Sequence, residues 1–190
     1  MKLPERSGDK LRIGVAITIP EPYSTVLQAA RGRFGDPWAD FIPPHITLLG
    51  PTVVDPDEIE AVDEHLSSVA ASHRPFLVHL RGTETFRPVS PVVFVQLVEG
   101  SSGCAALERS VRSHVLEQEL RFDYHPHVTV AHEVADEQLD SAYAELAGFD
   151  ASFLVDSFHS YAHGDDGVWR PVRDFSLTGA AADAGVVSPT

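Results

Sequence analysis

A five-residue segment that occurs twice constrains the fold of this chain more than any other feature. PHITL at residues 44–48 has a counterpart 82 residues later, PHVTV at residues 126–130. Side chains alternate between the two faces of a β-strand, so each segment places its histidine and threonine together on one face. The two aliphatic residues then lie on the other face. The sequence therefore predicts two equivalent strands, each with a core-facing side and a side that carries an imidazole and a hydroxyl.

Secondary-structure elements are expected in the same order around both segments. The 82-residue shift also aligns Ile13 with Val95 and Phe76 with Phe158. The predicted order is β-α-β-α-β followed by β-α-β-α-β-β, a near-duplication that would let the two histidines and two threonines line one cleft. The predicted units are a single bilobal domain over 1–178, repeats over about 11–88 and 91–178, and a disordered tail over 179–190.

Local patterns define the individual elements. LRIGVAITI, after a charged N-terminal segment, is rich in β-branched residues, which is typical of a buried strand. Asp55-Pro56 supplies an N-cap residue and a proline at the first helical position, so a helix is expected to begin there. Further helices are predicted over 23–34, 101–119 and 136–146. Strands are predicted over 11–19, 45–49, 76–86, 92–98, 127–131, 152–161 and 168–177.

Composition and charge exclude several classes of protein. The chain has 14 basic and 28 acidic residues and a formal net charge of −14, which disfavours binding to duplex nucleic acid. No apolar run approaches the roughly 20 residues that span a bilayer, and residues 1–10 lack the apolar core of a secretory signal. The single cysteine, Cys104, cannot form an internal disulfide. We expect a soluble, cytoplasmic protein that does not bind membranes, with a monomer favoured.

The paired motifs suit phosphoryl transfer without a metal. An imidazole has an ordinary pKa of about 6.5, so near neutral pH one histidine can accept a proton while the other donates one. Hydrolysis of a phosphodiester or cyclic phosphate needs such a pair. His45 and His127 are therefore the candidate catalytic residues. The hydroxyls of Thr47 and Thr129 are the candidate donors of hydrogen bonds to the non-bridging phosphate oxygens. This chemistry requires no metal and no other cofactor.

The doubled H-Φ-T-Φ pattern, where Φ is apolar, resembles the 2H phosphoesterase superfamily, in particular its 2′-5′ RNA ligase-like (LigT-like) branch. Phe86-Arg87-Pro88 before a strand and Trp169 in the closing strands add to the similarity. The resemblance implies an α+β, bilobal fold with two antiparallel-rich sheets around a central cleft and helices outside. It also implies action on 2′,3′-cyclic phosphates, 1″,2″-cyclic ADP-ribose phosphates or 2′-5′ linkages. RNA ligation ranks below hydrolysis, because water is in vast excess.

By the same resemblance, His45 would act on the leaving or 2′-oxygen side and His127 on the other. Which histidine is the acid and which the base stays open, since the roles reverse with the direction of reaction. The acidic composition favours a small nucleotide or an RNA end as the substrate. The residues that could complete a substrate pocket are Tyr124, His125, Phe86, Arg87, Trp169 and Arg170.

Three other interpretations compete with this one. His125 and His127 share a strand face and invite a metal site, but His132 would point to the opposite face of a regular strand, and a third ligand is usually needed. The chain could instead bind nucleotides or RNA ends without turnover. In the third interpretation it is an interaction module in which both motifs are relics.

Overall fold

A computed structural model describes residues 3–180 of the chain, which form two four-stranded antiparallel sheets with helices packed against them. The predicted α+β class is confirmed. The tail predicted over 179–190 falls outside the described residues from 181 onward. The strands are β1 (Leu11–Thr18), β2 (His45–Val54), β3 (Phe76–Thr85), β4 (Val92–Glu99), β5 (His127–His132), β6 (Asp150–Val155), β7 (Ser157–His163) and β8 (Trp169–Ser176). The α-helices are α1 (Tyr23–Arg33), α2 (Ile59–Ser72), α3 (Ser101–Val111) and α4 (Asp136–Glu145).

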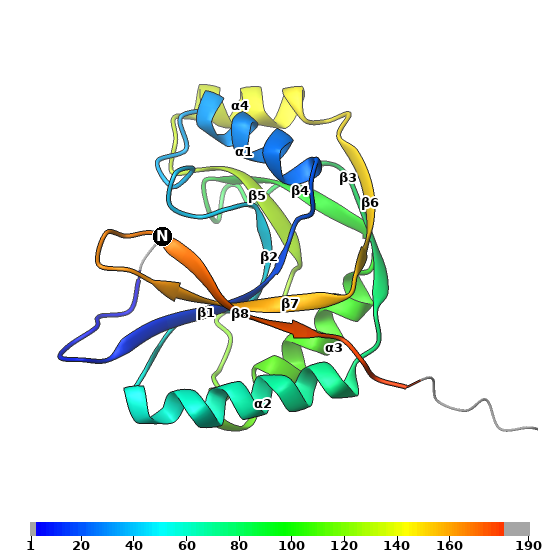
Figure 1. Cartoon of the computed structure of the whole chain (residues 1–190). Helices are drawn as coiled ribbons and strands as arrows, with labels where there is room; N and C mark the ends of the chain where they lie inside the picture. The colour runs from blue at the N-terminus through cyan, green and yellow to red at the C-terminus, as the bar shows by residue number, and fades with distance from the viewer. Residues whose placement is uncertain (1–2, 181–190) are drawn as a thin grey trace, which may run out of the picture.

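Each sheet takes strands from both predicted repeats. Sheet A has the order β2-β1-β7-β8, and sheet B has the order β5-β4-β3-β6. The 82-residue shift relates β2 to β5, β1 to β4 and β3 to β7, so three positions in the two sheets correspond. The outer strands β8 and β6 are not related by this shift. Figure 1 shows β7 running beside β1, although the two strands stand near opposite ends of the chain.

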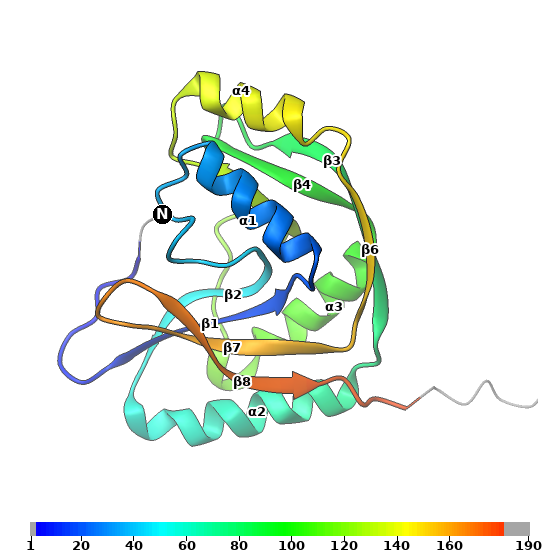
Figure 2. The same ribbon diagram turned by 45° about the horizontal axis from the view of Figure 1, so that its top comes forward.

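Each sheet is likewise covered by one helix from each predicted repeat. α1 packs against β5 and α4 against β3, β4 and β5, so both cover sheet B. α3 packs against β2 and α2 against β8, so both cover sheet A. Figure 2 shows α1 and α4 on one side of the molecule and α2 on the other. One continuous apolar core joins both layers. None of the helices within residues 3–180 is long and apolar enough to span a membrane.

A β-bulge follows each histidine-threonine motif at the same place. In sheet A, Thr47 pairs with Ala16 and Leu49 with the preceding residue of β1, so Leu48 has no partner. In sheet B, the β5–β4 pairing skips Val130 in the same way. A bulge inserts one extra residue and reverses the alternation of faces beyond it. Two consecutive residues in each strand, 48–49 and 130–131, are consequently buried.

The strand expected over 45–49 continues to Val54, and two further predicted elements differ from the structure. The helix expected over 101–119 ends at Val111, because Arg112 leaves the helical region and His114 adopts a positive φ of 52°. The strand expected over 152–161 is two strands, β6 in sheet B and β7 in sheet A, which meet at Asp156. The run of strand-forming residues conceals this crossing because both strands favour the same residue types.

Truncating a fully buried aromatic side chain should destabilise the fold. Phe158 of β7 is 0% exposed and stacks on Phe175 of β8 with ring centroids 5.2 Å apart. We expect Phe158→Ala to lower the free energy of unfolding by about 3–5 kcal/mol, through lost burial and an unfilled cavity. Val172→Ala on the exposed surface of β8 is the control and should change it by no more than about 0.5 kcal/mol. Urea denaturation measures the free energy of unfolding of both variants. An equal loss of stability in the two would contradict the assignment of Phe158 to the core.

Candidate functional site

The histidines of the two motifs lie in one cavity. His45 and Thr47 stand at the start of β2 in sheet A, and His127 and Thr129 at the start of β5 in sheet B. All four side chains line a cavity of about 220 Å³. Each sheet thus contributes one imidazole and one hydroxyl to the same space.

Both imidazoles are held by the same hydrogen bond. His45 Nδ1 lies 2.7 Å from the carbonyl oxygen of Pro43, and His127 Nδ1 lies 2.7 Å from that of His125. A carbonyl oxygen only accepts, so each Nδ1 carries the proton. Nε2 is then the nitrogen that can accept a proton in each neutral ring. The Thr47 hydroxyl lies 3.1 Å from Nε2 of His45, to which it donates.

Burial lowers the pKa of both imidazoles. The pKa of His127 falls to about 4, chiefly through burial, although the bond to the His125 carbonyl opposes the shift and the charges of His125 and His45 add to it. The pKa of His45 is also lowered by burial, against the effect of the Pro43 carbonyl, and the Arg31 guanidinium lowers it further. Both rings are therefore neutral at pH 7 in the free protein.

Two aromatic side chains pack against the imidazole of His127. The Phe86 ring meets it edge-on, with centroids 4.9 Å apart and an interplanar angle of 89°, and the Phe94 centroid lies 5.0 Å away. Phe86 also lines the cavity. These rings exclude water from one side of the imidazole, which accounts for the large effect of burial on the pKa of His127.

A smaller apolar pocket of about 90 Å³ adjoins the cavity. The two spaces share Ile42, His45 and Thr47. The indole of Trp169 forms part of the pocket and is 8% exposed. Gly14 lies beneath it, where an added Cβ would stand 3.2 Å from the indole ring. A flat apolar group can thus be accommodated next to the two polar side chains of β2.

Most of the chain matches one known protein family. Residues 19–167 match the family model described as the 2′-5′ RNA ligase superfamily, which is well over half of the chain. The chain belongs to this superfamily. The resemblance drawn from the paired motifs is therefore confirmed at the level of the family.

Curated relatives of this superfamily member are found in Bacillus. A protein of Bacillus licheniformis named "Putative phosphoesterase" is 29% identical over 169 residues, which covers 88% of this chain and 99% of the relative. A protein of Bacillus thuringiensis with the same name is 25% identical over 169 residues, or 88% of this chain and 97% of the relative. The chain thus matches these relatives over nearly their whole length.

Solved structures of the superfamily fold also match. Escherichia coli LigT complexed with NADP+ aligns with a TM-score of 0.65 at 19% identity, over 89% of this chain and 99% of LigT. LigT complexed with 3′-AMP gives the same values. The protein TT0787 of Thermus thermophilus aligns with a TM-score of 0.57 at 23% identity, over 90% of this chain and 100% of that protein. These likenesses establish the fold.

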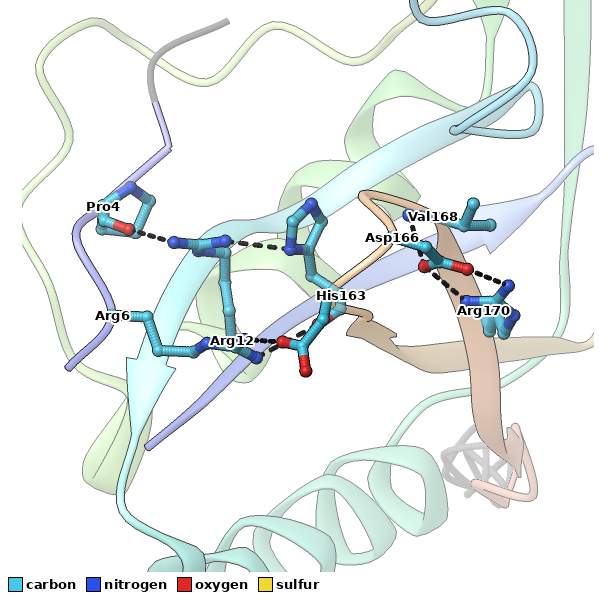
Figure 3. Close-up of polar contacts among 8 residues, drawn as sticks. Pro4, Arg6, Arg12, His163, Asp166, Val168 and Arg170 are labelled. Atoms are coloured by element: carbon cyan, nitrogen blue, oxygen red, sulfur yellow. Dashed lines mark hydrogen bonds and ion pairs between the residues drawn. The ribbon is translucent and has the colours of Figure 1, made fainter. Parts of the chain in front are cut away.

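Two arginines predicted to contact substrate line neither the cavity nor the pocket. Arg87 pairs with Asp140 at 2.7 Å on the surface. Arg170 pairs with Asp166 at 2.6 Å near the turn between β7 and β8, as Figure 3 shows. The guanidinium of Arg170 holds the pKa of the Asp166 carboxyl well below its usual range. Both arginines are thus engaged by carboxylates outside the site.

Tyr124 and His125 support the site from outside the cavity. The Tyr124 hydroxyl donates to the Thr47 carbonyl at 2.8 Å, which ties the segment before β5 to β2. The His125 ring is exposed, with its centroid 5.5 Å from that of Phe86, and its carbonyl orients His127. The two residues therefore act on the motifs through backbone groups.

The structure places His132 in the cavity, which corrects an expectation from the sequence. We expected this side chain to point away from His127, because an interval of five residues changes face on a regular strand. The bulge at Val130 adds a residue and restores the face. No group of three or more His, Cys, Asp and Glu side chains within residues 3–180 is arranged to hold a metal ion.

Two further residues line the cavity that the sequence analysis did not single out. Arg31 belongs to α1, and Trp38 to the turn that follows it. Arg31 stands four residues after the buried Leu27, so it is a charged residue on the apolar face of a helix. That position is a signal that sequence reasoning can use, because a charge there must find a partner. Trp38 offers no comparable clue.

The tautomers and pKa values of the site can be measured directly. In the free protein we expect the His127 imidazole to remain neutral, with its proton on Nδ1, until the pH approaches about 4, because burial disfavours the cation. Two-bond ¹H–¹⁵N spectra of the histidine rings across a pH titration report both properties, with His127→Gln for assignment. A midpoint at or above the ordinary value of about 6.5 would contradict the burial argument.

Proposed function

We propose that this chain is a metal-independent phosphoesterase that hydrolyses 2′,3′-cyclic or 2′-5′-linked nucleotide phosphodiesters. The observation that carries the proposal is the shared cavity, in which two imidazoles from different sheets each have Nδ1 bound to a carbonyl. Membership of the 2′-5′ RNA ligase superfamily and the phosphoesterase names of the Bacillus relatives support the same class of activity.

The reaction uses one imidazole as a base and the other as an acid. The base takes a proton from water at Nε2 while the water oxygen attacks phosphorus. The acid, protonated at Nε2, gives its proton to the ribose oxygen as the bond from phosphorus to that oxygen breaks. A cyclic phosphate is thereby opened to a phosphomonoester. His45 and His127 exchange these two roles in the reverse direction, in which the ribose hydroxyl attacks phosphorus and water leaves.

The threonines and the apolar pocket would bind the substrate. The hydroxyl of Thr129 can donate to a non-bridging phosphate oxygen, where charge builds up in the transition state, and the hydroxyl of Thr47 can do the same once it turns away from Nε2 of His45. The base of a nucleotide would lie against Trp169 in the adjoining pocket, since aromatic side chains stack on any base. The LigT structures with 3′-AMP and NADP+ support a small nucleotide as the ligand.

Removing either imidazole should stop turnover without unfolding the protein. We expect His45→Ala and His127→Ala each to lower kcat for 2′,3′-cyclic AMP by at least roughly 10²-fold, the contribution typical of a positioned acid or base. His79→Ala is the matched control, because His79 pairs with Asp150 at the surface, outside the cavity. Retained turnover in either cavity variant, with unchanged circular dichroism, would refute the paired mechanism.

Chelation separates this mechanism from a metal-dependent one. Turnover of 2′,3′-cyclic AMP should be the same with and without EDTA, because the proton transfers need only the two imidazoles. Complete loss with EDTA, restored by a single metal, would contradict the proposal. Tight binding of 3′-AMP by the wild-type protein, without hydrolysis of any cyclic or 2′-5′-linked substrate, would instead identify a nucleotide-binding protein.

The lowered pKa values fix the direction of the pH dependence. At pH 7 both imidazoles are neutral in the free protein, so the base form is abundant and the acid form is scarce. Lowering the pH increases the protonated fraction until the base is protonated as well. We therefore expect kcat/KM to reach its maximum below a pH of about 6.5, the ordinary pKa of histidine. A maximum above about pH 8 would contradict this assignment.

A further inference from the structure

Arg31 is the one lysine or arginine among the described residues that line the cavity. Arg31 is 3% exposed, and its side chain projects from the last turn of α1, which packs against β5. The cavity also holds both catalytic candidates, His45 and His127, and both threonines. A buried guanidinium therefore faces the same space as the groups that would handle the phosphate.

Two contacts fix the orientation of this guanidinium. Nε donates to the Asp36 carboxylate at 3.0 Å, and Nη1 donates to the carbonyl oxygen of Ile42. Asp36 is itself anchored, because it accepts a hydrogen bond from the backbone amide of Trp38 at 2.9 Å. A guanidinium has five N–H donors, and Nη2 has no hydrogen-bond partner among residues 3–180. Donors are thus left over for a ligand on a side chain that is already held in place.

The charges around the cavity favour an anion at this point. The Arg31 charge lowers the pKa of His45 and contributes to the lowered pKa of His132, so it acts on two sides of the cavity. With the imidazoles neutral, Arg31 is the permanent positive charge among the described residues that line this cavity, in a protein of net charge −14. Asp36 balances it only in part, since the carboxylate occupies the Nε edge of the guanidinium.

We propose that Arg31 is a phosphate-binding residue, which donates from its free guanidinium nitrogen to a non-bridging oxygen of the phosphoester bound between the two imidazoles. The proposal rests on the proposed function and adds an ionic contact to the two threonine hydroxyls. Guanidinium groups suit this task because their planar donors match phosphate oxygens and stay charged at every working pH. The buried Asp36 is then a positioning residue, which holds the guanidinium group of Arg31 in its orientation toward the cavity.

The variants must separate phosphate binding from the stability of a buried ion pair. Removing Arg31 alone would leave Asp36 charged and unpaired, which is strongly destabilising. The double variant R31M/D36N removes both charges and keeps an oxygen that can accept from the Trp38 amide. R31K retains a positive charge but loses the planar guanidinium group and its several N–H donors. R33M is the matched control, because Arg33 lies two residues further along α1 and pairs with Glu145 on the surface.

Binding of inorganic phosphate, measured by isothermal titration calorimetry, tests the inference independently of turnover. We expect R31M/D36N to bind phosphate roughly 10- to 100-fold more weakly than the wild type, as for loss of one charge-assisted hydrogen bond. R33M should bind as the wild type does. Equal affinity in the wild type and R31M/D36N would overturn the proposal, and so would a wild-type protein that binds no phosphate. If R31M/D36N fails to fold by circular dichroism, R31K decides: weaker binding supports the proposal and unchanged binding overturns it.

Turnover of 2′,3′-cyclic AMP tests the proposed function separately. If the wild type hydrolyses it, R31M/D36N should lose kcat/KM by roughly 10- to 100-fold, with R33M unchanged. If the wild type hydrolyses no cyclic or 2′-5′-linked substrate but binds phosphate through Arg31, the proposed function fails and this inference stands. If the wild type is active and R31M/D36N retains its full kcat/KM, the inference fails and the proposed function stands.

Discussion

The hydrogen bond from each imidazole Nδ1 to the carbonyl two residues earlier is the interaction on which the site depends. In His45 and His127 alike, this bond selects the tautomer with the proton on Nδ1, orients the ring and leaves Nε2 as the nitrogen that can accept a proton. A proline separates the carbonyl-bearing residue from the histidine in both motifs, and the residue before a proline is held extended. The backbone thus sets the direction of the carbonyl group. A neutral imidazole that donates to this carbonyl from Nδ1 is held in one orientation.

The electrostatic character of the cavity differs from that of the whole chain. Acidic residues give the protein its net charge of −14, but the described residues that line the cavity bring neutral imidazoles, hydroxyls, aromatic and aliphatic side chains and one guanidinium. The ion pair between Arg31 and Asp36 is buried, and Asp36 balances the guanidinium charge only in part, because it occupies only the Nε edge. An anionic ligand would therefore meet a locally favourable surface inside a molecule that repels polyanions at long range.

The sequence predicted the family, the fold class and the faces of the two motif strands, because strand alternation depends only on local geometry. It failed where a feature arises from pairing between strands. The bulge at Val130 is a property of the β4–β5 register, so the position of His132 could not be read from β5 alone. The crossing from sheet B to sheet A at Asp156 was hidden because β6 and β7 favour the same residue types, and only their pairing shows that they belong to different sheets. The contribution of Arg31 depends on where α1 packs, although its place on an apolar helix face was a usable signal.

The interleaving of the sheets has a consequence for how this protein is made. Ile13 of β1 pairs with Ala162 of β7, so sheet A joins residues from near both ends of the described chain. While the polypeptide is being synthesised, β1 and β2 emerge from the ribosome long before the strands that complete their layer. Sheet B, whose strands all lie between residues 76 and 155, can assemble earlier. The half of the cavity that holds His45 is therefore finished last, when β7 and β8 have emerged.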